Sequence, residues 1–205
     1  METKGLKINC LGASNTRIIK TVDGITVRDV NYPVILGLIL RCTVRNYGLP
    51  GSNIAVTPDR SDSYAERVAG MEKDADLVIL QGWGNDARHG VPIGRPADLR
   101  PDTYIGALEL CILNIEKIYP RSKLILLSGF SVRRSTKRLG DGLPYEEFAE
   151  AFFETGRRFG CEPLDFYSDS RFDPDNPEAL PDGIHMSEKT CRIYSDKVAD
   201  LIRDL

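Results

Sequence analysis

The chain has 205 residues, of which 41% are hydrophobic and 28% are charged. This composition is ordinary for a globular domain and argues against a disordered or membrane-embedded chain, so we expect a single domain over 1–205. The net charge of −3 argues against a protein that binds nucleic acid through a basic face.

Short apolar runs alternate with segments of helical period, which is the pattern of a βαβ chain. Strands are expected at 6–12, 42–48, 75–83, 123–130 and 161–167. Helices are expected at 31–42, 60–73, 102–119, 144–159 and 187–205, the last with Ser187 as its N-cap. The third and fourth strands are apolar at consecutive positions, as in strands covered on both faces. Right-handed crossovers then predict an α/β fold, a three-layer α/β/α sandwich with a parallel sheet.

The cellular compartment and the binding partners are judged from the targeting, membrane-span and disulfide signals that the sequence lacks. The N-terminal sequence METKGLKINCLGAS has charges and a glycine where a secretory signal needs an unbroken apolar run. No stretch approaches the roughly 20 apolar residues of a membrane span. Five cysteines without a CxxC pair read as reduced side chains rather than a disulfide frame or a zinc site. We therefore expect a cytoplasmic protein that acts on a small molecule, without nucleic-acid or membrane-spanning partners.

Polar residues follow the expected strands, at the edge where parallel sheets place their ligand sites. The first strand leads into GASNT (12–16), where Ser14 would stand exposed, although small polar residues are also ordinary turn chemistry. The second leads into NYGLPGSN (46–53), which by itself reads as a turn. The third leads into GWGNDARHG (82–90), where the Asn85 amide could donate to a developing oxyanion.

The stretch LPDGIHMSE (180–188) places one of only two histidines three residues after Asp182. A serine hydroxyl needs a base to take its proton, and histidine is suited to that role. The base needs an acceptor on its far nitrogen, which Asp182 could supply to His185 across the turn. The alternative is that Asp182 caps its own turn and His185 is a solvated surface residue.

Taken together, these segments resemble the SGNH (GDSL-like) hydrolase family over nearly the full length of the chain. Four motif blocks occur in the family's order: LGASNT, NYGLPG, the GND of GWGND, and DGIH. The resemblance implies a flavodoxin-like fold with a five-stranded parallel sheet in the order 2-1-3-4-5. It also implies hydrolysis of an acyl ester by a serine triad, without a metal or other cofactor.

The resemblance also assigns roles to individual residues. Ser14 corresponds to the nucleophile, His185 to the base and Asp182 to the residue that orients it. The backbone N–H groups of Ser14 and Gly51 and the side-chain amide of Asn85 correspond to the oxyanion hole. The sequence departs from the family at two places, reading Gly-Ala-Ser for GDS and placing Trp83 where GxND has its glycine, which bears on turn geometry and substrate fit.

The substrate is suggested by the loops around the expected site. Seven basic residues lie after the third and fourth strands: Arg88, Arg95, Arg100, Arg133, Arg134, Lys137 and Arg138. A basic rim of this kind could select an anionic ester, with Arg88, Arg133 and Trp83 as substrate-binding residues, or could simply be solvated. With no apolar lid segment, we expect a short acyl group, acetyl, on a carbohydrate, with lysophospholipase or thioesterase activity as the alternatives.

Three other interpretations remain open at this stage. The GASNT loop could cradle phosphate in a nucleotide-binding flavodoxin-like module without catalysis. The Ala13 change could mark a catalytically inactive SGNH scaffold. A metal hydrolase could use Asp86, His89, Asp182 and His185, although the chain has no HExxH or paired DxH spacing.

Overall fold

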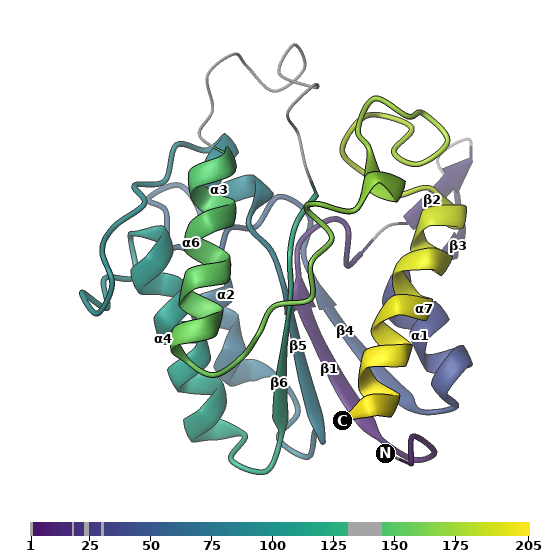
Figure 1. Ribbon diagram of the computed structural model, residues 1–205, viewed down its shortest axis with the longest axis horizontal. Helices are drawn as coiled ribbons and strands as arrows, with labels where there is room; N and C mark the ends of the chain where they lie inside the picture. The colour runs from purple at the N-terminus through teal and green to yellow at the C-terminus, as the bar shows by residue number, and fades with distance from the viewer. Residues whose placement is uncertain (1, 18, 23–24, 30, 131–144) are drawn as a thin grey trace.

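The computed structural model describes residues 2–17, 19–22, 25–29, 31–130 and 145–205 (Figure 1). Its strands are β1 (Lys7–Gly12), β2 (Ile19–Val22), β3 (Ile25–Asp29), β4 (Thr43–Gly48), β5 (Leu77–Gln81) and β6 (Lys123–Leu127). Its α-helices are α1 (Tyr32–Leu40), α2 (Tyr64–Arg67), α3 (Gly84–Arg88), α4 (Tyr104–Ile118), α6 (Tyr145–Arg158) and α7 (Glu188–Asp204). Two short 3-10 helices occur at Val68–Gly70 and Ser170–Phe172.

The main sheet has four parallel strands in the order β4-β1-β5-β6. The helices α2, α4 and α6 cover one face, and α1 and α7 cover the other (Figure 1). Successive side chains of β5 enter opposite cores: Val78 and Leu80 pack on the α4 side, and Leu77 and Ile79 on the α7 side. Strands buried on both faces explain the unbroken apolar runs, and the layering is that of an α/β/α sandwich.

The expected fifth strand, 161–167, is not a strand in the structure. It contributes one parallel bridge, between Leu164 and Leu127, with hydrogen bonds at 2.9 and 3.1 Å on either side of it. Pro163 has no N–H to donate to a ladder. The Asp165 carboxylate accepts the N–H groups of Tyr167 and Ser168, which turns the chain away from β6.

Other departures from the expected elements are local. The hairpin β2–β3 and the five-residue helix α3 were not predicted, because neither is long enough to show a clear period. The helix expected at 60–73 is shorter, since Ser63 caps α2 through a capping box and Val68 already begins a 3-10 turn. Ser187 caps α7 by accepting the N–H of Thr190, as predicted.

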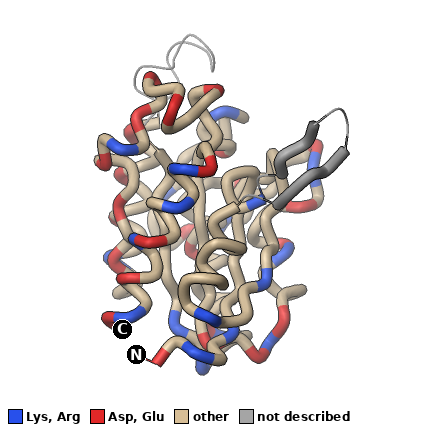
Figure 2. Tube along the Cα trace, turned by 90° about the vertical axis from the view of Figure 1, so that its right-hand side faces the viewer, with Lys and Arg blue, Asp and Glu red and all other residues tan. Residues whose placement is uncertain are grey.

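Both chain ends lie at one end of the molecule (Figure 2), opposite the carboxyl ends of the strands. Lys and Arg are interspersed with Asp and Glu along the trace rather than gathered in one segment. No helix within the described part of the chain is both long and apolar enough to cross a membrane. In parallel sheets, ligand sites lie beyond the carboxyl ends of the strands, so a site is expected among the loops at that edge.

Candidate active site

The turn after β1 holds Ser14 at the carboxyl edge of the sheet. The N–H of Arg17 donates to the carbonyl of Ser14 at 2.9 Å, which closes the turn. Gly12 is required there, because a Cβ atom at this position would lie 1.9 Å from the Thr16 hydroxyl. That hydroxyl donates to the side-chain oxygen of Gln81 at 2.9 Å, which anchors the turn to the end of β5.

Ser14, His185 and Asp182 form one hydrogen-bonded chain. The Ser14 Oγ atom lies 2.9 Å from His185 Nε2, and His185 Nδ1 lies 2.6 Å from Asp182 Oδ2. The imidazole side chain is 40% exposed and the carboxylate 49%, so water and a substrate can reach them. This series of hydrogen bonds brings together Ser14 and His185, which are 171 positions apart in the sequence.

Asp182 has two structural tasks, one on each carboxylate oxygen. Oδ2 contacts the imidazole, while Oδ1 accepts the backbone N–H groups of Ile184 and His185 at 2.9 and 2.7 Å. Burial by itself would raise the pKa of Asp182, but the hydrogen bonds from His185 and Ile184 outweigh it and lower the pKa. The carboxylate is thus held ionised, and Asp182 both caps its own turn and contacts the imidazole.

Asn15 joins the two halves of this arrangement, and the sequence analysis did not single it out. Its Nδ2 donates to the carbonyl of Ile184 and its Oδ1 accepts the N–H of Met186, both at 3.1 Å. These bonds fasten the Ser14 turn to both sides of His185. The only sequence signal was a polar residue in a turn, which is too common to be diagnostic.

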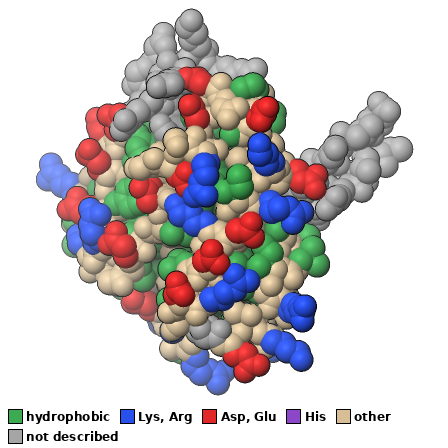
Figure 3. Space-filling model, turned by 45° about the vertical axis from the view of Figure 1, so that its right-hand side comes forward, with side chains coloured by type: hydrophobic (Ala, Val, Ile, Leu, Met, Phe, Trp, Pro, Cys, Tyr) green, Lys and Arg blue, Asp and Glu red, His purple; other side chains and the backbone are tan. Residues whose placement is uncertain are grey.

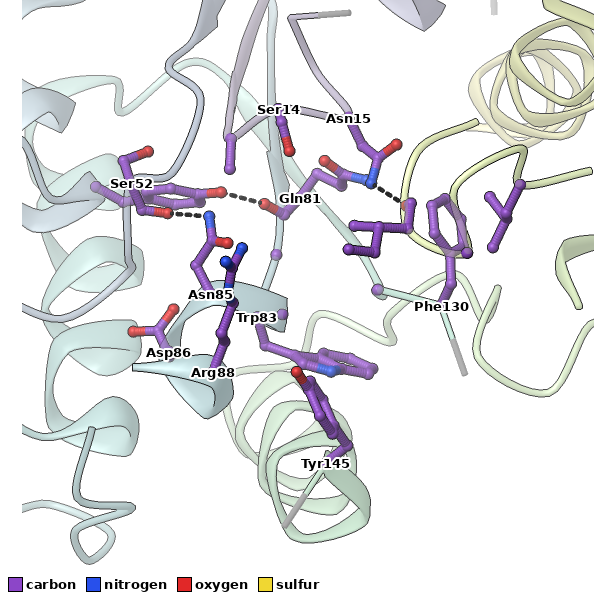
Figure 4. Close-up of a pocket in the computed structure, with 18 residues that line it drawn as sticks. Ser14, Asn15, Ser52, Gln81, Trp83, Asn85, Asp86, Arg88, Phe130 and Tyr145 are labelled. Atoms are coloured by element: carbon purple, nitrogen blue, oxygen red, sulfur yellow. Dashed lines mark hydrogen bonds between the residues drawn. The ribbon is translucent and has the colours of Figure 1, made fainter. Parts of the chain in front are cut away.

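A cavity of about 90 Å³ opens beside Ser14 (Figure 4). Asn85, the second residue of α3, lines it and donates one amide hydrogen to the carbonyl of Ser52 at 2.9 Å. Its second amide hydrogen has no recorded acceptor among the described residues. Ser52 also lines the cavity, whereas Gly51 lies one residue away with φ +78°, a conformation that favours glycine.

The neighbouring Asp86 is buried and holds the loop that follows Ser52. Its carboxylate accepts the N–H groups of Ile54 and Ala55, both at 2.9 Å. Burial raises the pKa of Asp86 to about 7, although these two N–H groups oppose the shift. His89 Nδ1 lies 2.8 Å from Asn53 Oδ1 instead of facing Asp86.

The residues of the metal hypothesis therefore point to different partners. Asp86 faces backbone amides, His89 faces Asn53, and Asp182 and His185 contact each other. Within the described ranges, no three His, Cys, Asp or Glu side chains are grouped so as to hold a metal ion.

Asp86→Asn should flatten the pH dependence of stability. The raised pKa means that the folded protein binds more protons than the unfolded chain between about pH 4 and 7, so the free energy of unfolding falls as pH rises. The slope contributed by Asp86 is at most about 1.4 kcal/mol per pH unit. Urea unfolding across this range should show a shallower decline in the variant. The exposed Asp59→Asn should keep the wild-type slope; equal slopes in all three proteins would contradict the assignment.

The predicted substrate-binding residues have different outcomes. Trp83 is 2% exposed and lines the cavity, with its ring packed edge-on against Phe152 of α6 at 5.2 Å. Arg88 also lines it, three residues after Asn85 on α3, and both are labelled in Figure 4. Arg133 lies outside the described residues. Arg100 is ion-paired with Asp102 at 2.7 Å.

The structure describes only part of the expected basic rim. On the face drawn in Figure 3, basic and acidic side chains alternate. Arg134, Lys137 and Arg138 lie outside the described residues, so the part of the rim expected after β6 is not described. Arg88 is the predicted basic residue that the structure brings to the cavity.

A parallel α/β sheet with a Ser-His-Asp arrangement beyond its strand ends indicates a hydrolase-like class of fold. Solved structures named as lipases and an aryl esterase share this fold. Neither a protein-family model nor a curated protein matches the sequence.

Three of these solved structures are named as follows. A possible lipase from Chitinophaga pinensis has 21% identity and a TM-score of 0.70 over 97% of this chain and 98% of its own. A GDSL-like lipase candidate from Bacteroides ovatus has 16% identity and a TM-score of 0.71 over 98% and 100%. The aryl esterase of M. smegmatis has 19% identity and a TM-score of 0.69 over 98% and 99%. At these identities the likeness shows a common fold.

Proposed function

We propose that this protein is a serine hydrolase of short-chain acyl esters. The observation that carries the proposal is the Ser14–His185–Asp182 chain, with contacts of 2.9 and 2.6 Å, beside a cavity that Asn85 lines. The lipase and esterase names of the solved structures with this fold support the same class of reaction.

In this proposal the reaction has two halves. Ser14 Oγ attacks the ester carbonyl while His185 Nε2 takes the hydroxyl proton, and Asp182 stabilises the imidazolium that forms. The tetrahedral intermediate collapses, the alcohol leaves with the proton from His185, and an acyl-serine remains. Water then attacks the acyl-serine with His185 as the base, which releases the carboxylic acid and restores Ser14.

The oxyanion of each tetrahedral intermediate needs donors close to Ser14. We assign the backbone N–H groups of Ser14 and Gly51 and the second amide hydrogen of Asn85 to this role. The bond from Asn85 to the Ser52 carbonyl supports the assignment, because it fixes the amide plane before the charge develops. One donor of this kind contributes on the order of 3 kcal/mol to transition-state stabilisation.

The cavity supports a small acyl group. Its volume of about 90 Å³ has room for an acetyl group, which is the basis for proposing a short acyl chain. Arg88, which lines the cavity, could bind an anionic group, and Trp83 offers an apolar wall, as an O-acetylated acidic carbohydrate would need. Lysophospholipase or thioesterase activity is the alternative within the same chemistry.

The chain-length dependence of ester hydrolysis tests this proposal. With p-nitrophenyl esters from acetate to octanoate, kcat/KM should be highest for acetate and fall by at least about tenfold by octanoate, because the longer chains exceed the cavity. Ser14→Ala provides the background rate for each ester. A maximum at octanoate would favour the lipid alternative, and rates equal to the Ser14→Ala background throughout would contradict ester hydrolysis.

A further inference from the structure

Arg67, the last residue of α2, donates hydrogen bonds to four oxygens from separate segments. It donates to the carbonyls of Gly12 at 3.1 Å and Tyr47 at 2.5 Å, to the Ser52 hydroxyl at 3.0 Å, and to the Asp62 carbonyl at 2.8 Å. These contacts join the end of β1, the end of β4 and the loop that lines the cavity.

The partners of Arg67 lie next to the proposed reacting groups. Gly12 is two residues before Ser14, and the Ser52 carbonyl is the acceptor that fixes Asn85. A single guanidinium therefore connects the turn that carries the hydroxyl to the segment that orients an oxyanion donor. Asp86 holds the far side of that segment through Ile54 and Ala55.

The bonding of Arg67 is unusual for a surface arginine. The neighbouring carboxylate of Asp62 is paired with Arg60 at 2.5 Å, so the recorded partners of the Arg67 guanidinium are carbonyl and hydroxyl oxygens. Its guanidinium also lies 5.2 Å from the centre of the Tyr64 ring, whose hydroxyl donates to the Gln81 carbonyl at the end of β5. Burial lowers the pKa of Arg67, although Tyr64 and Asp62 oppose the shift.

We propose that Arg67 is a positioning residue, which fixes the distance and orientation of Ser14 relative to the oxyanion donors at Gly51 and Asn85. This inference rests on the proposed esterase function. The planar guanidinium of Arg67 can donate to acceptors in several directions, whereas a lysine ammonium has its three donors on one nitrogen. Displacement of the reacting groups by about 1 Å can cost on the order of 100-fold in rate.

Steady-state kinetics on p-nitrophenyl acetate test the role of Arg67. Arg67→Gln should lower kcat by roughly 10- to 100-fold with KM changed by less than about threefold, and Arg67→Lys should recover only part of the loss. Arg45→Gln is the matched control. Arg45 lies on β4 but is paired with Asp74 at 2.6 Å, and its loss should leave kcat within about threefold of wild type.

A double-mutant cycle distinguishes positioning from general stability. If Arg67 acts through Ser52, the effects of Arg67→Gln and Asn85→Ala on kcat should be strongly non-additive. The second substitution would then disturb an orientation of the Asn85 amide that the first has already lost. Arg45→Gln and Asn85→Ala should be additive. All assays are run well below the melting temperature of each variant. In a separate experiment, millimolar guanidinium should partly restore kcat in Arg67→Ala.

Two outcomes would overturn the inference. One is a kcat of Arg67→Gln within about threefold of wild type in folded protein. The other is additivity with Asn85→Ala and no rescue by guanidinium, which would leave Arg67 with a purely structural role. Failure of the proposed function is recognised separately, because wild type would then not exceed Ser14→Ala.

Discussion

Ser14→Ala is expected to lower kcat for p-nitrophenyl acetate by about 10⁴- to 10⁶-fold, and His185→Ala by a similar factor. The Ser14 hydroxyl lies 2.9 Å from His185 Nε2, so each residue is of little use without the other. The double variant should therefore be no slower than either single variant. A fluorophosphonate should add covalently to the peptide that contains Ser14 in wild type and not in Ser14→Ala.

Matched controls make the result specific. Ser168→Ala removes an exposed hydroxyl, and His89→Gln removes the other histidine, which contacts Asn53. Both should keep kcat within about threefold of wild type. If Ser14→Ala retained more than about a tenth of the activity, ester hydrolysis would have to use another nucleophile.

Asp182→Asn is expected to lower kcat by about 10⁴-fold while the fold is retained. The asparagine oxygen can still accept the N–H groups of Ile184 and His185, so the turn should survive. Its NH₂ group would then face His185 Nδ1 as a donor. The imidazole would adopt the tautomer protonated on Nε2, which cannot accept the proton of Ser14. The measurement is kcat together with the melting temperature.

Asp165→Asn is the comparison for this variant. Asp165 also accepts two backbone N–H groups, from Tyr167 and Ser168, and its recorded contacts do not include a histidine. It should cost some stability and leave kcat within about threefold. A loss below about tenfold in Asp182→Asn would mean that Asp182 serves its turn and not the imidazole.

Two other hypotheses are less well supported by the contacts around Ser14. In the GASNT loop, the N–H groups of Thr16 and Arg17 already donate to Ala13 and Ser14 carbonyls, which leaves fewer donors for a phosphate. Ala13 suggested an inactive scaffold. However, Ser14 and His185 still contact each other although residue 13 is an alanine. The Ser14→Ala and labelling experiments decide between these hypotheses and the esterase.

Much of the fold could be predicted because its signals are local. The buried strands β5 and β6 are short apolar runs, and the α7 cap is a single serine before a helical period. The resemblance to the SGNH family came from motif blocks rather than from periodicity, and solved structures named as lipases and an aryl esterase share this fold. The prediction of a fifth strand at 161–167 was wrong, because Pro163 and Asp165 redirect an apolar segment that otherwise resembles a strand.

The sequence by itself determined which polar residues follow the strands, and the motif blocks that resemble the SGNH family, rather than residue type and spacing alone, singled out Ser14, Asp182 and His185. The tertiary structure decided which other residues contact the segments that carry them. Asn15 bonds to Ile184 across 169 positions, and Arg67 reaches Gly12 across 55. Neither has a local pattern that sets it apart from an ordinary turn or surface residue. Such roles depend on which backbone carbonyls and amides the packed sheet brings within about 3 Å, and only folding fixes those distances.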